Sequence, residues 1–151
     1  MKSSFASNTV VSAPKTRGEI EDLIQKYGGV EFASGYDQLQ AKIMFKLQDK
    51  LILFRLPLPQ KKDFTHKKTK WGTEKVNDSA MQKNWEQATR TKWRALLLCL
   101  KAKLESAASG ITSFEEEFLP HFVMSNGRTL GETIIPQLAE NLSKNNLLLG
   151  I

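Results

Sequence analysis

Apolar and polar residues alternate along the segment from Leu39 to Leu47, where every second side chain is apolar. This period of two predicts a β-strand with one buried face and one face in water. Residues 51–56 are rich in β-forming side chains, and the polar residues 48–50 between the two runs predict a turn. Val30 and Phe32, which alternate with Glu31 after Gly28-Gly29, predict another short strand. The pattern therefore predicts an antiparallel sheet of three to four strands.

Elsewhere the apolar positions recur with the spacing of a helix. The longest such stretch, residues 79–107, predicts a helix capped by Asp78 or Ser79, with an apolar stripe that includes Trp93. Three further helices are predicted from capping boxes, in which a Ser or Thr stands three residues before a Glu. They are 16–27, with Thr16 as the cap, 113–119, with Thr112 or Ser113 as the cap and Glu115 or Glu116 as its partner, and 129–142, with Thr129 and Glu132. The expected fold class is α+β, a small antiparallel sheet packed against one long helix, with additional N- and C-terminal helices.

The length of the chain, 151 residues, suits one domain with a single core. Residues 1–15 are rich in Ser and small side chains and predict a flexible N-terminal tail, which leaves 16–151 as a single α+β domain. Residues 60–77 show no sustained periodicity and predict a basic mobile loop within that domain. Pro136 predicts a kink or a break in the last helix.

Positive charge is concentrated in the middle third of the chain. The sequence has 22 Lys and Arg against 16 Asp and Glu, a net charge of +6. Residues 61–107 contain twelve of these basic residues and five of the acidic ones, which leaves ten against eleven elsewhere. A segment this basic favours a polyanionic partner.

The single cysteine, Cys99, cannot form a disulfide within the chain, and the leucines around it predict a buried thiol. The N-terminus lacks the apolar core of a signal peptide, and no apolar run approaches the roughly 18 residues of a membrane span. We therefore expect a soluble cytoplasmic protein that has no membrane partner.

Lysines and aromatic side chains are interleaved in the predicted loop. Such a segment can neutralise phosphates through its lysines and stack its rings on unpaired bases. On the long helix, two arginines four residues apart extend the positive charge along one side. The alternative for both features is a solvated surface without a partner. The candidate nucleic-acid-binding residues are Lys61, Lys62, Phe64, Lys67, Lys68, Lys70, Trp71, Arg90 and Arg94.

A second candidate interface is apolar. Trp85 shares a helix face with Trp93, and this placement is more typical of a core or a protein interface than of a stacking platform. Leu147, Leu148 and Leu149 lie near the end of the sequence, where packing on the domain or on a partner would remove them from water. These four residues define a candidate protein interface, and self-association into a homo-oligomer is one form of it.

No pattern in the chain predicts a catalytic centre. The glutamates at 115–117 are not spaced as metal ligands, and helix capping accounts for them. His66 and His121 lie far apart with no cysteine pair near either, and no glycine loop of the phosphate-binding kind is present. We therefore expect no catalytic residue, no metal site and no cofactor.

Several strings of the sequence resemble a known group of proteins. They are Trp93-Arg94-Ala95-Leu96, the segments 101–105, 110–119 and 127–129, and Lys26-Tyr27-Gly28. The group consists of small bacteriophage and prophage proteins usually described only as hypothetical. The resemblance implies a phage origin and the cytosol of a host cell, and it assigns no role to any residue.

These observations lead to two functional hypotheses. The first is a small phage-encoded accessory protein that binds nucleic acid, single-stranded DNA or RNA, without strong sequence preference. The second is a noncatalytic protein-interaction module or inhibitor that acts on a host defence or nucleic-acid-processing protein.

Overall fold

The two alternating runs pair as strands β2 (Gln40–Leu47) and β3 (Lys50–Pro57) in the computed structural model, which describes residues 5–142. The turn between them has positive φ at both central residues, 48° at Gln48 and 61° at Asp49. This conformation matches the twist of a two-residue hairpin. Strand β1 (Val30–Tyr36) pairs antiparallel with the other side of β2, so the sheet order is β1-β2-β3.

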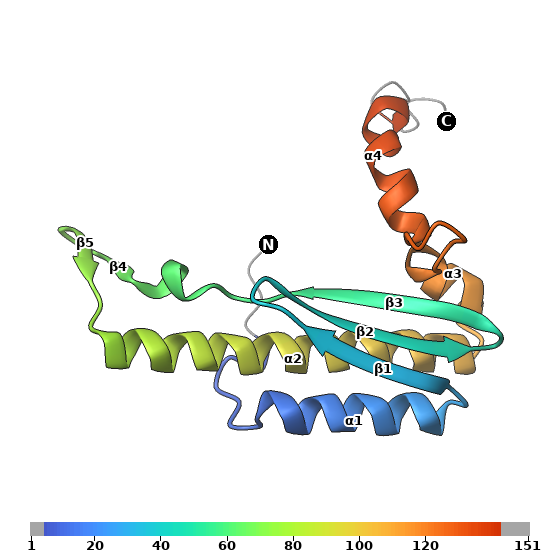
Figure 1. Ribbon diagram of the computed structural model, residues 1–151, viewed down its shortest axis with the longest axis horizontal. Helices are drawn as coiled ribbons and strands as arrows, with labels where there is room; N and C mark the ends of the chain where they lie inside the picture. The colour runs from blue at the N-terminus through green and yellow to red at the C-terminus, as the bar shows by residue number, and fades with distance from the viewer. Residues whose placement is uncertain (1–4, 143–151) are drawn as a thin grey trace.

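One face of this sheet is covered by helices α1 (Ala13–Lys26) and α2 (Asp78–Ala108), which lie side by side beneath it (Figure 1). The predicted alternation in β2 is confirmed, because every second residue of β2 from Ala41 to Leu47 is buried. The side chains that close the core from the helices are Ile20, Ile24, Trp93, Leu96, Leu100 and Leu104. Burial of each such side chain contributes about 1.5–3 kcal/mol.

The buried residues of α2 all lie from Trp93 onward. Its N-terminal half continues beyond the end of the three-stranded sheet (Figure 1). Asn77 caps the helix, since its side chain accepts a hydrogen bond from the backbone N–H of Ala80 at 2.8 Å. The long helix is thus confirmed, with a cap one residue before the predicted candidates.

Helix α1 begins earlier than the sequence predicts. Its N-cap is Ser12, whose hydroxyl accepts from the backbone N–H of Lys15, whereas Thr16 is fully buried inside the helix. The prediction of Thr16 as the cap was wrong. The Thr16 side chain is buried in the core, and the hydroxyl of Ser12 caps the backbone N–H at the start of the helix. The segment expected as a tail over residues 1–15 therefore includes the first turn of α1.

Residues 5–12 lie along α2. The side-chain amide of Gln87 donates to the carbonyl oxygens of Ser7 and Thr9, both at 2.9 Å, and the Thr91 hydroxyl donates to that of Ala6 at 3.1 Å. These contacts join segments about 80 residues apart in the sequence, which local patterns do not reveal.

The C-terminal part consists of α3 (Phe114–Phe118), the 3-10 turn η2 (Leu119–His121) and α4 (Leu130–Leu142). The predicted capping boxes are confirmed in Ser113 with Glu116 and in Thr129 with Glu132. The Thr129 backbone N–H, followed by the Arg55 guanidinium, holds the pKa of Glu132 below its usual range. Arg55 on β3 thereby connects α4 to the sheet, with 2.5 Å between its Nε and Oε1 of Glu132.

Helix α4 runs through Pro136. Proline has no N–H to donate to the carbonyl oxygen four residues earlier, which belongs to Glu132. The guanidinium of Arg128 donates to that oxygen instead, at 2.9 Å. The hydrogen bond replaces the missing helical one, so the proline does not end the helix.

The α+β prediction is confirmed, with one addition and one correction. The addition is a second sheet of two strands, described below. The correction concerns Cys99, which is exposed and not buried as predicted, because its side of α2 faces neither the sheet nor α1. Among residues 5–142, no helix has the length and apolar character needed to cross a membrane.

Candidate nucleic-acid interface

The segment expected as a loop over residues 60–77 forms a small arm. It contains the 3-10 turn η1 (Lys61–Phe64) and a hairpin of strands β4 (His66–Thr69) and β5 (Gly72–Lys75). The hairpin lies at the N-terminal end of α2, away from the three-stranded sheet (Figure 1). Every residue of both strands is exposed, and the period of two was undetectable because neither face is apolar.

Two residues, Lys70 and Trp71, form the tip of the hairpin. The Thr69 hydroxyl holds the turn, because it donates to the carbonyl oxygen of Gly72 at 3.1 Å and accepts from the Trp71 backbone N–H at 3.3 Å. The Trp71 side chain is 91% exposed. The Lys70 ammonium lies 5.8 Å from the centre of the indole. An aromatic ring and a positive charge are therefore presented together in water.

The pairing of the strands gives the hairpin two different faces. His66 lies opposite Lys75, and Lys68 lies opposite Thr73. Residues directly opposite one another in an antiparallel pair share a face, as do residues two apart along a strand. These four residues therefore form one face, which we call the basic face.

The other face of the hairpin carries balanced charge. Lys67 lies opposite Glu74, and their side chains form an ion pair with 3.2 Å between Nζ and Oε2. Both side chains are more than half exposed, so this ion pair adds little stability. It does place a carboxylate beside the only lysine of that face.

The base of the arm is attached to α2 through Trp85. The indole N–H donates to the carbonyl oxygen of Pro59 at 2.8 Å, and the Lys61 ammonium lies 4.7 Å from the ring centre. Phe64, in η1 beside α2, is also half-buried. Trp85 was predicted as part of a partner interface, and Phe64 as a stacking ring. Both are half-buried at the base of the arm, where they lie against other residues of the same chain.

Arg90 and Arg94 have partners on a different flank of α2. Arg90 donates to the side-chain oxygen of Gln87 at 2.6 Å and to the carbonyl oxygen of Thr9 at 3.4 Å. Arg94 forms an ion pair with Glu19 of α1. Both arginines are half-buried. The structure therefore does not bring them together with the lysines of the arm, and their contacts join α1 and the N-terminal segment to α2.

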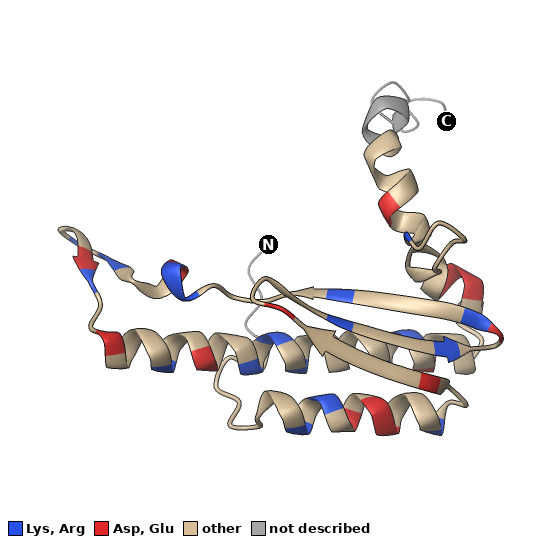
Figure 2. Cartoon of the chain, in the orientation of Figure 1, with Lys and Arg blue, Asp and Glu red and all other residues tan. Residues whose placement is uncertain are grey.

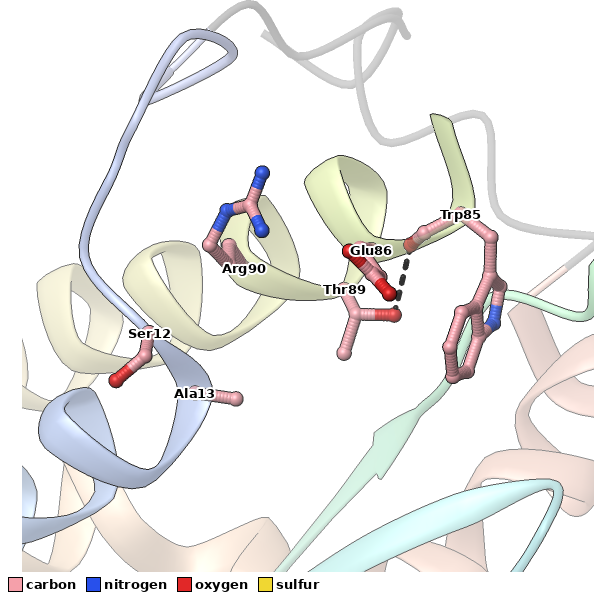
Figure 3. A pocket seen from close by; sticks show the side chains of 6 residues that line it. All are labelled: Ser12, Ala13, Trp85, Glu86, Thr89 and Arg90. Atoms are coloured by element: carbon pink, nitrogen blue, oxygen red, sulfur yellow. Dashed lines mark hydrogen bonds between the residues drawn. The ribbon is translucent and has the colours of Figure 1, made fainter. Parts of the chain in front are cut away.

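A shallow depression separates Arg90 from Trp85 (Figure 3). It is lined by Ser12, Ala13, Trp85, Glu86, Thr89 and Arg90 and has a volume of about 180 Å³. Pockets that enclose small-molecule ligands are larger, roughly 300–1,000 Å³. The Thr89 hydroxyl in it already donates to the backbone carbonyl oxygen of Trp85 at 2.9 Å. The depression is a gap between elements that favours no particular ligand.

Positive charge predominates in the arm. Residues 61–75 contain six lysines and two acidic residues, Asp63 and Glu74. Figure 2 shows basic residues in η1 and along the hairpin. Lys75 completes the basic face and was not among the predicted site residues, because only the strand register pairs it with His66.

The remaining candidates for a protein interface are the leucines near the end of the sequence. Leu147, Leu148 and Leu149 lie outside the described residues. Within residues 5–142, no three His, Cys, Asp or Glu side chains lie close enough together to hold a metal ion.

Comparison with protein-family models, with curated proteins and with solved structures gives no match. The interpretation of the arm therefore depends on its own geometry.

Proposed function

We propose that this protein binds nucleic acid through the arm, without strong sequence preference, as a small phage-encoded accessory protein in the cytosol of the host. The observation that carries the proposal is the exposed hairpin, which buries no apolar face of its own and presents lysines around an exposed tryptophan. Such a hairpin adds nothing to the core, so its composition is better explained by a partner than by folding.

The chemistry of the arm accounts for the expected lack of sequence preference. Lysine ammonium groups contact phosphates, which are the same in every sequence, and an indole can stack on any base. Four phosphate contacts, from Lys62, Lys68, Lys70 and Lys75, would make the logarithm of the affinity fall with the logarithm of the salt concentration. The slope would be about −3 for a single strand.

The proposed interface is smaller than the set predicted from the sequence. Lys61 lies over the Trp85 ring and Lys67 is paired with Glu74, so both contribute less to phosphate binding. Arg90 and Arg94 hold the chain together on the other flank of α2. The residues proposed to contact nucleic acid are Lys62, Lys68, Lys70, Trp71 and Lys75, with His66 beside them.

The proposal is tested by fluorescence anisotropy with labelled oligonucleotides over a series of salt concentrations. The double variant Lys68→Glu/Lys70→Glu should weaken binding at least tenfold, because two lost contacts become two repulsions. The matched control is Lys83→Glu/Lys101→Glu, which makes the same change of charge on exposed positions of α2 and should retain most of the affinity. Absence of binding by the unmodified protein at low salt would refute the proposal.

A specific observation favours the second hypothesis, a noncatalytic protein-interaction module or inhibitor of a host protein. Helix α4 extends away from the sheet and the other helices (Figure 1), with Ile134 40%, Ile135 61% and Leu138 40% exposed. Apolar residues gathered on one helix are typical of a protein interface. If the partner is a second copy, sedimentation should show a mass that rises with concentration, and Ile135→Asp should abolish that rise.

A further inference from the structure

The two faces of the β4–β5 hairpin differ in charge although they share the same eight residues of strand. The basic face has His66 and Lys68 on β4 and Lys75 on β5, with only Thr73 beside them. The opposite face has Lys67 with the Glu74 carboxylate at 3.2 Å. A phosphate on the basic face meets the ammonium groups of Lys68 and Lys75 and no carboxylate of the hairpin. A phosphate on the other face meets a lysine and a carboxylate, whose effects largely cancel.

We infer that a single strand of nucleic acid lies along the basic face of the hairpin and places one base on the Trp71 ring. This inference rests on the proposed function and adds to it the face that is used and the form of the nucleic acid. Residues two apart on a strand lie about 7 Å apart, so His66 and Lys68 give the basic face length along β4.

The position of Trp71 favours a single strand. The ring is 91% exposed at the tip, beside Lys70, and its turn is held by Thr69. Stacking requires the face of a base, and in a duplex those faces are covered by neighbouring base pairs. An unpaired base can turn its face to the indole, which typically strengthens binding about tenfold or more per base.

The placement of the lysines also suits a single strand. A two-stranded ribbon in the major groove of DNA turns one face to the base edges, and the phosphates of the two backbones flank its two edges. Lys68 and Lys75 lie on one face of the hairpin, where a single backbone can contact both of them.

The test compares adjacent residues of β4 on opposite faces. In Lys68→Gln and Lys67→Gln the same charge is removed from exposed positions of the same strand, so the fold is equally unaffected. For a single strand of thymidines, Lys68→Gln should lower the affinity several-fold and reduce the salt slope by about 0.7, the value of one phosphate contact. Lys67→Gln should leave the slope unchanged. The variant Lys67→Gln/Glu74→Gln, which keeps the net charge, should bind as the unmodified protein does.

The stacking part is tested with Trp71→Ala and a strand that lacks bases at its central positions. Trp71→Ala should weaken the intact strand about tenfold and leave the abasic strand unchanged, since the phosphates are the same. Equal losses for Lys67→Gln and Lys68→Gln, or tighter binding to a matched duplex, would overturn this inference while the proposed function stands. Absence of binding to either form would overturn the proposed function itself.

Discussion

Two hairpins of the molecule, β2–β3 and β4–β5, are both antiparallel pairs but differ in length and in burial. Strands β2 and β3 have eight residues each and bury every second side chain of β2 from Ala41 to Leu47 against two helices. Strands β4 and β5 have four residues each, and all are exposed. Both hairpins have a two-residue turn. Whether a hairpin becomes part of the core or an exposed arm therefore depends on apolar residues at alternate positions and not on the turn.

The comparison also shows how an arm that buries no apolar core is held against the rest of the protein. A two-stranded hairpin alone is only marginally stable in water. Here the β4–β5 hairpin follows η1 in the chain, and Trp85 of α2 holds the residues just before η1 through the carbonyl oxygen of Pro59. At its other end, the Val76 backbone N–H donates to the carbonyl oxygen of Thr65 at 2.8 Å, which closes the arm at its base.

The largest effect is expected in the β2–β3 hairpin. Phe45→Ala removes a fully buried ring that packs beside Phe54, with 6.4 Å between the ring centres. The free energy of unfolding should fall by about 3–5 kcal/mol, as measured by denaturant titration. The control Thr73→Ala, in the exposed hairpin, should change it by less than about 0.5 kcal/mol. Similar losses in the two variants would contradict the assignment of core and arm.

An intermediate effect is expected where the arm joins α2. Trp85→Phe keeps an aromatic ring under Lys61 and removes the hydrogen bond to Pro59. The stability should fall by about 1 kcal/mol. Hydrogen exchange measured by mass spectrometry should become faster in residues 60–65 and stay the same in β2 and β3. Unchanged exchange in 60–65 would show that the arm is held by other contacts.

A smaller effect is expected from pH. His121 stacks on Phe54 of β3, with 3.8 Å between the ring centres, and burial lowers its pKa, with a further contribution from Lys103. The folded protein thus takes up this proton less readily than the unfolded chain, in which histidine has a pKa near 6.5. Stability should therefore decrease as the pH falls below about 6.5.

His121→Phe keeps a ring against Phe54 and should remove this decrease, as followed by thermal unfolding between pH 7 and pH 5.5. His66→Gln, changed in the arm, is the matched control and should keep the decrease because His121 is still present. An unaltered pH profile in His121→Phe would contradict the assignment.

The smallest effect on stability is expected at the tip of the arm. Trp71→Ala removes a ring that contacts water over most of its surface, so the free energy of unfolding should change by less than about 0.5 kcal/mol. The variant should also lose the part of the tryptophan fluorescence that comes from a ring in water. Of the two tryptophans that remain, Trp85 is half-buried and Trp93 is only 5% exposed. A loss above 1 kcal/mol would mean that Trp71 packs on the domain.

The sequence by itself determined the elements whose signals are local. The alternation in β2, the apolar stripe of α2 and the capping boxes at Ser113 and Thr129 predicted real elements, because each depends on residues a few positions apart. The sequence also indicated that the segment 61–75 is strongly basic, with six lysines against two acidic residues.

The tertiary structure alone decided which charged and aromatic residues are available to a partner. Arg94 pairs with Glu19 and Trp85 binds Pro59, over separations of 75 and 26 residues, and no local period reports such contacts. Likewise, the register of β4 with β5 placed Lys75 beside His66 and Glu74 beside Lys67. Local periodicity records which side of an element is apolar, whereas the partner of a polar group depends on how the elements pack.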